Sequence, residues 1–449
     1  MSAARRLVGG LMAVCLGVAV PAAAADVITD WNTTLLSTIA AAPAVPGPAR
    51  IVEIAKVHIA MHDAVQAIQQ RYETYCEGIT PTSGSVIAAA SKAARDMLVN
   101  LFPPQTAAID ATYQAYLAAH QIAGDDPGIA AGAQAAAALI QKRVGDGTYP
   151  VPAPAFLGSN EIGKWRPTVL DAAGQPAPMA SSWMANAITF AVEHTSQFFS
   201  GTPPQVTSRQ YTEEYNEVKA LGRNVGSTRT PEQTALAIFY SDNPLVYWNR
   251  SMRQLVDRHI TDPGDSARMF ALVNMAIADA LFTSWQSKVQ WNVWRPVTAI
   301  QLGESDGNRR TVGDPTWQPF FATPNYPDYT SGANSVSGAA TEMLRLFFRT
   351  DRVPFTVIGA NSNRDYMAFS EAADDVVEGR ILMGIHFRFA DVAARESGQR
   401  VARWAYKYYL RSLETGDEFP FVEDLDVFEE IGRVDGALSG QDNDDAELP

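Results

Sequence analysis

The sequence has few cysteines, fewer basic than acidic residues, and no long hydrophobic run beyond its first residues. Its 449 residues include 2 Cys, 35 Lys and Arg, and 49 Asp and Glu, which gives a formal net charge of −14. Nucleic acids and anionic membrane surfaces select a basic face, so this balance argues against either as the main partner. After residue 26 no uninterrupted apolar run has the length of a membrane span, so we expect none. A composition of 47% hydrophobic and 19% charged residues is instead typical of a globular protein with a large core.

Residues 1–25 have the organisation of a secretory signal peptide. A start with two arginines is followed by an apolar stretch and then by small residues. We therefore expect cleavage after Ala25 and an exported protein, located in the periplasm or outside the cell. The single cysteine that remains, Cys76, excludes an internal disulfide and a cysteine-based zinc site.

Helical periodicity dominates the rest of the chain. The predicted helices cover residues 51–70, 91–102, 106–121, 129–144, 208–221, 230–256, 266–289, 334–348, 371–388 and 392–412. A Pro-rich stretch at residues 148–178 predicts an irregular connection, and residues 354–358 give the best strand signal. We expect a mainly α fold of two packed helical bundles, with an N-terminal helical half at residues 26–200 and a second half at residues 201–415.

The last segment, residues 416–449, differs from the body in charge. It holds twelve acidic residues and one basic residue, Arg433. Such a composition predicts a solvated, flexible tail. Binding of calcium at residues 442–445 is a weaker alternative, because the segment lacks the glycine and the bidentate glutamate of an EF-hand loop.

Two cations lie close together in an apolar, Trp-rich segment. Lys288 and Arg295 are seven residues apart, almost two helical turns, so a continuous helix places both on one face. Pro296 then ends that helix. Cations in apolar surroundings need an anion nearby. Ordinary ion pairs, for example with Glu371 or Asp391, are the alternative to a bound anion.

Two further segments offer groups that suit an oxyanion. Residues 330–333, Thr-Ser-Gly-Ala, precede a predicted helix whose N-terminus directs N–H groups outward. Ser331 supplies a hydroxyl there, and Gly332 lets the backbone approach a ligand. Further along, Arg380 adds a third cation, and His386 follows six residues later with an imidazole that can attack phosphorus or ligate a metal centre.

Together and in this order, the three segments resemble the motifs of the vanadium-dependent haloperoxidase and type 2 phosphatidic acid phosphatase superfamily. Those motifs are K-x6-RP, PSGH and SR-x5-H, and here they correspond to residues 288–296, 330–333 and 379–386. The resemblance covers most of residues 26–415. It implies the haloperoxidase and acid phosphatase fold.

The resemblance also implies a cofactor and a set of roles. Vanadate is the implied cofactor, and phosphate can substitute for it. Three cations would hold the equatorial oxygens, and a hydroxyl and a backbone N–H would add hydrogen bonds. These residues are Lys288, Arg295, Arg380, Ser331 and Gly332. His386 would be the axial ligand to vanadium, or the nucleophile in a phosphatase.

One departure from the motifs affects the expected activity. The family's PSGH ends in an acid–base histidine, and Ala333 occupies that position here. Proton transfer by such a group contributes about 10²–10⁴-fold, so we expect impaired peroxidase activity toward halide, peroxide and a small-molecule substrate. The alternatives are an acid phosphatase with His386 as nucleophile, and a non-redox protein that binds an oxyanion or catalyses a rearrangement.

The remaining histidines and the tryptophans near the motifs have less specific signals. His58 and His62 are four residues apart, a spacing that can bind a metal, but packing between helices is the favoured interpretation. Core packing is likewise favoured over a substrate pocket for four tryptophans. They are Trp285, Trp291, Trp294 and Trp317.

Overall fold

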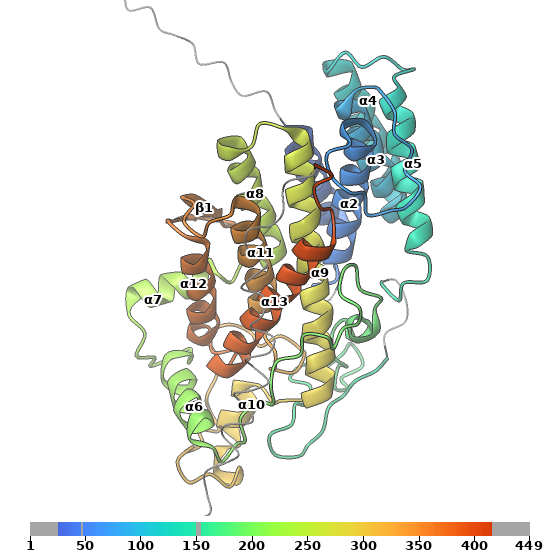
Figure 1. Cartoon of the computed structure of the whole chain (residues 1–449). Coiled ribbons are helices and arrows are strands. Elements are labelled where there is room, and N and C mark those ends of the chain that lie inside the picture. Colours follow the sequence, from blue (N-terminus) through green and yellow to red (C-terminus); the bar gives the residue numbers. More distant parts are fainter. Residues whose placement is uncertain (1–25, 46–47, 150–153, 415–449) are drawn as a thin grey trace, which may run out of the picture.

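A computed structural model describes residues 26–45, 48–149 and 154–414. The expected signal peptide at residues 1–25, the acidic tail at residues 416–449 and the calcium alternative within that tail lie outside the described residues. The described part is mainly α, as predicted, with two short strands (Figure 1).

The first helices pack together on one side of the molecule. They are α1 (Val27–Ala41), α2 (Ile51–Gln69), α3 (Val86–Leu101), α4 (Thr106–Ala119) and α5 (Pro127–Lys142). Helices α2, α3 and α5 contact one another, and their facing surfaces are rich in buried alanines. Small side chains allow helix axes to approach closely.

The later elements form the other side. They are α6 (Arg209–Leu221), α7 (Pro231–Phe239), α8 (Pro244–His259), α10 (Pro296–Gln301), α11 (Gly332–Phe348), β1 (Phe355–Ile358), β2 (Asn363–Tyr366), α12 (Phe369–Leu382) and α13 (Arg388–Tyr408). The strands β1 and β2 pair antiparallel. Helices α11 and α13 approach closely at two glycines, Gly338 and Gly398, where there is no room for a side chain. A Cβ on Gly338 would lie 2.3 Å from the Arg395 carbonyl oxygen, and a Cβ on Gly398 would lie 2.4 Å from the Ser335 carbonyl oxygen. This packing brings the beginnings of the two helices together.

Helix α9 (Pro263–Trp291) connects the two sides. It contacts α2 on one side and α11 and α13 on the other, and it runs between the two groups in Figure 1. Within the described part of the chain it is the one helix long and apolar enough to cross a membrane, and it is buried inside the protein. The division into halves at residue 200 stays a prediction.

Two predicted helices differ from the observed ones. The segment 230–256 forms two helices, because Asn243 caps a new helix that begins at Pro244. The first of the two begins with a capping box formed by Thr230 and Gln233. The segment 371–388 ends early at Leu382, and the next helix begins at Arg388. The loop between them carries His386.

Candidate active site

The first cation pair is positioned differently from the prediction. Helix α9 ends at Trp291, and Asn292 adopts a left-handed conformation with φ 50°. Arg295 is extended, with φ −83° and ψ 155°, because a residue before proline disfavours the helical region. The continuous helix predicted over Lys288 and Arg295 is therefore wrong, although a loop still brings the two cations to the same neighbourhood.

Lys288 holds the loop that leads to α11. Its Nζ donates to the carbonyls of Pro327 at 2.8 Å and Asp328 at 3.1 Å, and to that of Thr330. The side chain is fully buried, and this burial, together with the nearby charge of Arg295, lowers its pKa well below the usual value. All three donors of Lys288 thus shape the loop.

Arg295 lies between that loop and the loop that carries His386. Its Nε donates to the Tyr326 carbonyl at 2.7 Å, and its Nη1 donates to the Ile385 carbonyl at 2.6 Å. The same Nη1 lies 3.4 Å from Asp328 Oδ1. The ion-pair partner of Arg295 is therefore Asp328, and not Glu371 or Asp391. Its Nη2 is buried without a hydrogen bond.

Asp328 also fixes the imidazole of His386. His386 Nδ1 lies 2.7 Å from Asp328 Oδ1, and Arg295 Nη1 lies 3.1 Å from His386 Nε2. A proton on Nδ1 satisfies the carboxylate, so the Nε2 atom retains its lone pair. Burial and the charges of the three cations lower the pKa of His386 well below its ordinary value. The imidazole is neutral, as a ligand or a nucleophile must be.

The carboxyl group of Asp328 is itself perturbed. It is fully buried, and burial raises its pKa to about 7, while Arg295 and Lys288 act in the opposite direction. Its second oxygen accepts from the Phe387 N–H at 3.3 Å. Asp328 therefore contacts three groups at once: the Arg295 guanidinium, the His386 imidazole and the backbone N–H of Phe387.

The start of α11 lies next to this group. Ser331 occupies the N-cap position, but its side chain does not cap the helix, and its Oγ is buried without a hydrogen bond of standard geometry. The Asn334 amide donates to Asp391 Oδ1 at 2.7 Å. Burial raises the pKa of Asp391 well above its usual range, and the neighbouring Ser331 and Asn334 moderate this effect.

Arg380 approaches from α12. Its Nη1 donates to the Tyr240 carbonyl at 3.3 Å, and its Nε is buried without a partner. Two guanidinium donors around the His386 region are thus buried and unpaired, Arg295 Nη2 and Arg380 Nε. The Ser331 hydroxyl is also buried there, next to the Asp391 carboxyl group. An unpaired buried donor is costly, and a tetrahedral oxyanion supplies acceptors of the kind these groups need, so the residues present fit vanadate or phosphate.

A cavity of about 160 Å³ opens beside these donors. Arg380, Gly332 and Ala333 line it, together with apolar and aromatic side chains. Ala333 is 9% exposed. The position of the family's acid–base histidine therefore faces open space next to the oxyanion site.

Comparisons with known proteins find vanadium-dependent peroxidases among the similar proteins. A family model described as the VCPO second helical-bundle domain matches residues 268–415, which contain all of the candidate site residues. The vanadium chloroperoxidase of Curvularia inaequalis is 26% identical over 187 residues. That match covers 34% of this chain and 30% of the relative, so it spans less than a third of the relative's length.

Solved structures extend the likeness to most of the chain. A bacterial vanadium-dependent iodoperoxidase is similar with a TM-score of 0.71 at 22% identity, covering 87% of this chain and 97% of that one. A bacterial vanadium-dependent chloroperoxidase in its apo form is similar with a TM-score of 0.65 at 16% identity, covering 82% and 94%. The chain is therefore similar in fold to vanadium-dependent haloperoxidases over most of its length, and its residues 268–415 match the VCPO second helical-bundle domain.

The sequence motifs of the superfamily did not include Asp328 among the predicted site residues. Its sequence context offers a signal, because it is the one acidic residue in the aromatic stretch 315–330 that precedes Ser331. A lone acid at such a place is a natural partner for buried cations.

The other candidates of the sequence lie away from the haloperoxidase-type site. His58 Nε2 lies 2.9 Å from the Asn32 amide nitrogen, and His62 Nε2 lies 3.0 Å from the Glu73 carbonyl. Both rings are buried, as expected for packing residues. Within the described residues, no three His, Cys, Asp or Glu side chains gather as metal ligands. Of the tryptophans, Trp285 is fully buried and also borders the cavity.

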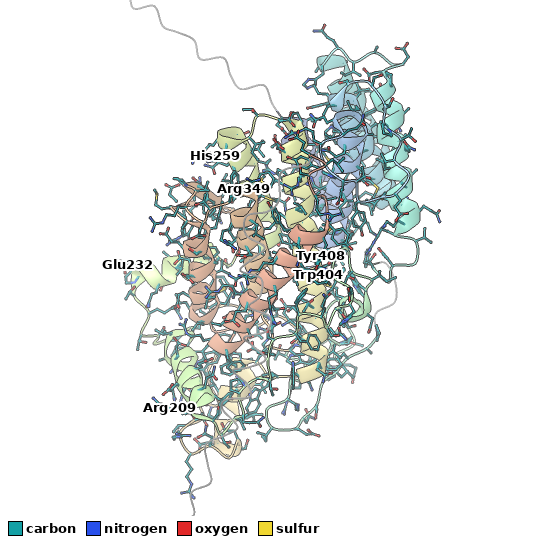
Figure 2. All side chains as sticks on the ribbon, in the orientation of Figure 1. Arg209, Glu232, His259, Arg349, Trp404 and Tyr408 are labelled. Atoms are coloured by element: carbon teal, nitrogen blue, oxygen red, sulfur yellow. The ribbon has the colours of Figure 1, made fainter. Side chains whose placement is uncertain are left out.

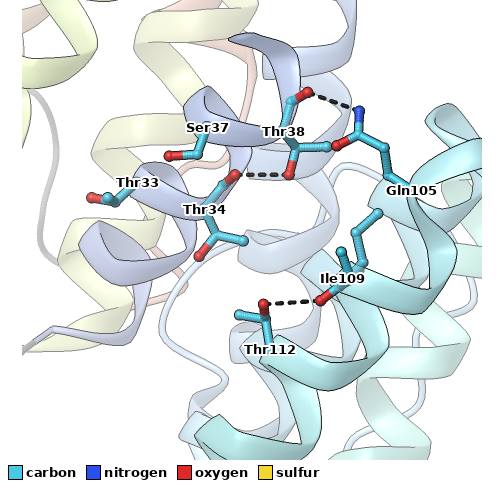
Figure 3. A pocket seen from close by; sticks show the side chains of 8 residues that line it. Thr33, Thr34, Ser37, Thr38, Gln105, Ile109 and Thr112 are labelled. Carbon is cyan, nitrogen blue, oxygen red and sulfur yellow. Dashed lines mark hydrogen bonds between the residues drawn. The ribbon is translucent and has the colours of Figure 1, made fainter. Parts of the chain in front are cut away.

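A larger groove between α1 and α4, of about 300 Å³, has a lining rich in hydroxyl groups (Figure 3). Those hydroxyls are already used within the helices. Thr38 donates to the Thr34 carbonyl at 2.8 Å, and Thr112 donates to the Ala108 carbonyl at 3.0 Å. The Gln105 amide closes the groove by donating to the Thr38 carbonyl at 2.9 Å. The residues that line this groove carry no charge, and its threonine hydroxyls are bonded within their own helices.

Proposed function

We propose that the protein binds a tetrahedral oxyanion, vanadate or phosphate, as an exported haloperoxidase-type protein with impaired peroxidase activity. The observation that carries the proposal is the pair of buried, unpaired guanidinium donors at Arg295 and Arg380, with the buried Ser331 hydroxyl beside them. Arginine N–H groups and a hydroxyl form strong, charge-assisted hydrogen bonds to such an anion. The export signal at residues 1–25 supports the proposed location outside the cytoplasm.

Different residues would make different contacts to the bound anion. Arg295 and Arg380 would donate to its oxygens, and Ser331 with the start of α11 would add neutral donors. Lys288 would act through charge and through the loop that it shapes. When bound, vanadate would supply the centre at which peroxide is activated for halide oxidation.

Asp328 and His386 prepare the position next to the anion. The Asp328 carboxylate holds the proton on Nδ1 of His386 and leaves Nε2 as the acceptor, which faces Arg295 Nη1. Burial and the cations around the ring lower its pKa and keep it neutral. In this state His386 would hold vanadate through Nε2 or act as a nucleophile toward a phosphate, so the arrangement also supports the phosphatase alternative.

Ala333 limits both activities. Its methyl group faces the cavity and carries no proton, so no group at this position can donate to a peroxide oxygen or to a leaving group. This loss favours a third alternative as well, a non-redox protein that binds an oxyanion or catalyses a rearrangement on the same scaffold.

The experiment measures three properties of the purified protein: vanadate and phosphate binding by calorimetry, bromide oxidation with peroxide after loading with vanadate, and phosphomonoester hydrolysis. We expect anion binding and weak turnover, and we expect the substitution Ala333→His to raise turnover by about 10²–10⁴-fold. The matched control is Ala108→His, which lies in the hydroxyl-rich groove between α1 and α4 and leaves turnover unchanged.

Two outcomes contradict the proposal. The oxyanion site would be refuted if neither vanadate nor phosphate bound and if His386→Ala did not differ from the parent protein in any of the three assays. Bromide turnover at the ordinary rate of haloperoxidases in the parent protein would refute the role assigned to Ala333.

A further inference from the structure

The cavity beside the oxyanion site has a lining that mixes apolar and polar surface. Leu281, Trp285, Tyr326 and Val336 supply apolar and aromatic surface, whereas Arg380 and Asn243 supply polar groups, and Arg380 also a charge. Such a lining suits a ligand that carries both an aryl group and an anionic group, because the rings can cover the first while Arg380 binds the second. We call this cavity the aryl chamber.

The aryl chamber and the oxyanion site share their boundary. Arg380 lines the chamber and also contributes the unpaired Nε to the site. The Tyr326 ring lies against the cations, with its centroid 4.9 Å from the Arg295 guanidinium and 5.0 Å from Lys288 Nζ. The Trp285 ring centroid is 4.8 Å from that of Tyr326. The aromatic rings therefore border both the chamber and the cations, and Arg380 is exposed to the chamber itself.

The volume of the chamber matches a single ring. It measures about 160 Å³, and an apolar protein cavity of about 150 Å³ is known to accept benzene. Ala333 lines this space, so a larger side chain at residue 333 would occupy part of it. Alanine instead of histidine at residue 333 therefore has two consequences: it removes the proton donor, and it leaves room for a ligand.

We infer that the ligand of this site is an aryl oxyanion, with one aromatic ring in the aryl chamber and its phosphate-like group on the donors of Arg295, Ser331 and Arg380. This inference rests on the proposed oxyanion site and specifies the class of compound that the site selects. The ring gains from transfer out of water and from contact with Trp285 and Tyr326. The anion is the same group that the proposed function requires.

The test compares phenylphosphonate with methylphosphonate and inorganic phosphate, by calorimetry on the full-length protein. The two phosphonates share the anion and differ in the apolar body. We expect phenylphosphonate to bind about 10- to 100-fold more tightly than methylphosphonate, because burial of one ring is comparable to burial of a large apolar side chain.

Two variants locate the ring. Ala333→Leu fills the chamber, so the preference for phenylphosphonate is lost while methylphosphonate binds as before. Val336→Ala enlarges the chamber, so the preference shifts by several-fold toward 2-naphthylphosphonate. Ala108→Leu, the same substitution in the distant groove between α1 and α4, keeps the phenyl preference.

The outcomes separate this inference from the proposed function. If neither inorganic phosphate nor methylphosphonate binds, the oxyanion site itself fails. If both bind but phenylphosphonate binds no more tightly, the site stands and the aryl ligand is overturned. A phenyl preference that persists unchanged in both Ala333→Leu and Val336→Ala also overturns the inference, because the ring would then lie elsewhere.

Discussion

Two fully buried aspartates, Asp279 on α9 and Asp328 beside α11, have opposite kinds of partner. The carboxylate of Asp279 accepts three backbone N–H groups, from Phe190 at 2.7 Å, Ala191 at 2.6 Å and Val192 at 2.9 Å. Burial raises its pKa to about 6, and the three N–H groups oppose this effect. Asp279 thus closes a loop against the central helix, and its hydrogen bonds involve only backbone.

Asp328 shares the depth of burial but pairs with ionisable side chains, Arg295 and His386. Arg295 retains a free donor at Nη2, and the Nε2 atom of His386 has no partner among the described residues other than Arg295 Nη1, so the carboxylate orders groups that can act on a ligand. The difference teaches that burial and a raised pKa do not by themselves mark an active site. The chemistry of the partners does.

Removal of Arg295 gives the largest expected effect. Arg295→Ala leaves Asp328 without its buried counter-charge and removes a donor for the anion, so unfolding in urea should show a loss of about 3–5 kcal/mol and phosphate binding should disappear. The control is Arg209→Ala, at the outer edge of α6 in Figure 2, which should leave the unfolding midpoint unchanged. Unaltered phosphate binding in Arg295→Ala would contradict the site.

A second comparison uses the buried His62, which bonds only to backbone. Burial lowers its pKa from 6.5 to about 4, so the folded protein keeps the ring neutral while the unfolded chain takes up a proton below pH 6.5. Stability from this group is therefore lost as the pH falls from 6.5 to 4, by up to about 3 kcal/mol. His62→Gln keeps a donor for the Glu73 carbonyl and should lose less stability over that window.

The measurement for this variant is urea unfolding at several pH values between 4 and 7. His194→Gln, at an exposed position, is the control and should follow the parent protein. Equal acid sensitivity of the parent and His62→Gln would show that His62 does not carry the effect. Anion binding at pH 7 should be the same in all three proteins.

The third prediction tests the loop-closing aspartate. Asp279→Asn removes the charge and at least one acceptor position, which leaves a buried N–H unpaired among Phe190, Ala191 and Val192. We expect a loss of about 2–3 kcal/mol in urea unfolding. Phosphate affinity should not change, and a parallel loss of affinity would show that Asp279 also serves the anion site.

The smallest expected effect is at Asp328 and appears as a ratio of affinities. Asp328→Asn releases the constraint on the tautomer of His386. This change should weaken the binding of vanadate, which would depend on Nε2 of His386, but not that of phosphate, which hydrogen bonds alone would hold. The ratio of vanadate to phosphate affinity should fall by about 10- to 100-fold. Loss of the negative charge of Asp328 changes the affinity for both anions to the same extent, so this effect cancels in the ratio. An unchanged ratio would mean that Asp328 does not position His386.

Local signals predicted much of the helical framework. Thr230, Asn243 and Pro244 have the capping chemistry of helix starts, and the predicted segment 230–256 begins at Thr230. The break at Pro244 was missed because the apolar periodicity continues across it. The helix over Lys288 and Arg295 failed for a similar reason, since spacing describes residues on a helix but does not say where that helix ends.

The sequence by itself determined the kinds of groups available: three cations, a hydroxyl beside a helix start, a histidine, and alanine where an acid–base group stands in the superfamily. Tertiary structure alone decided that Asp328 joins Arg295 to His386 and that the aryl chamber lies beside Ala333. Arg295 and His386 are 91 residues apart, and their contact depends on how α9, α11 and α13 pack. Periodicity and motif spacing describe neighbours along the chain, whereas hydrogen bonds and cavities depend on side chains that only the packed helices bring together.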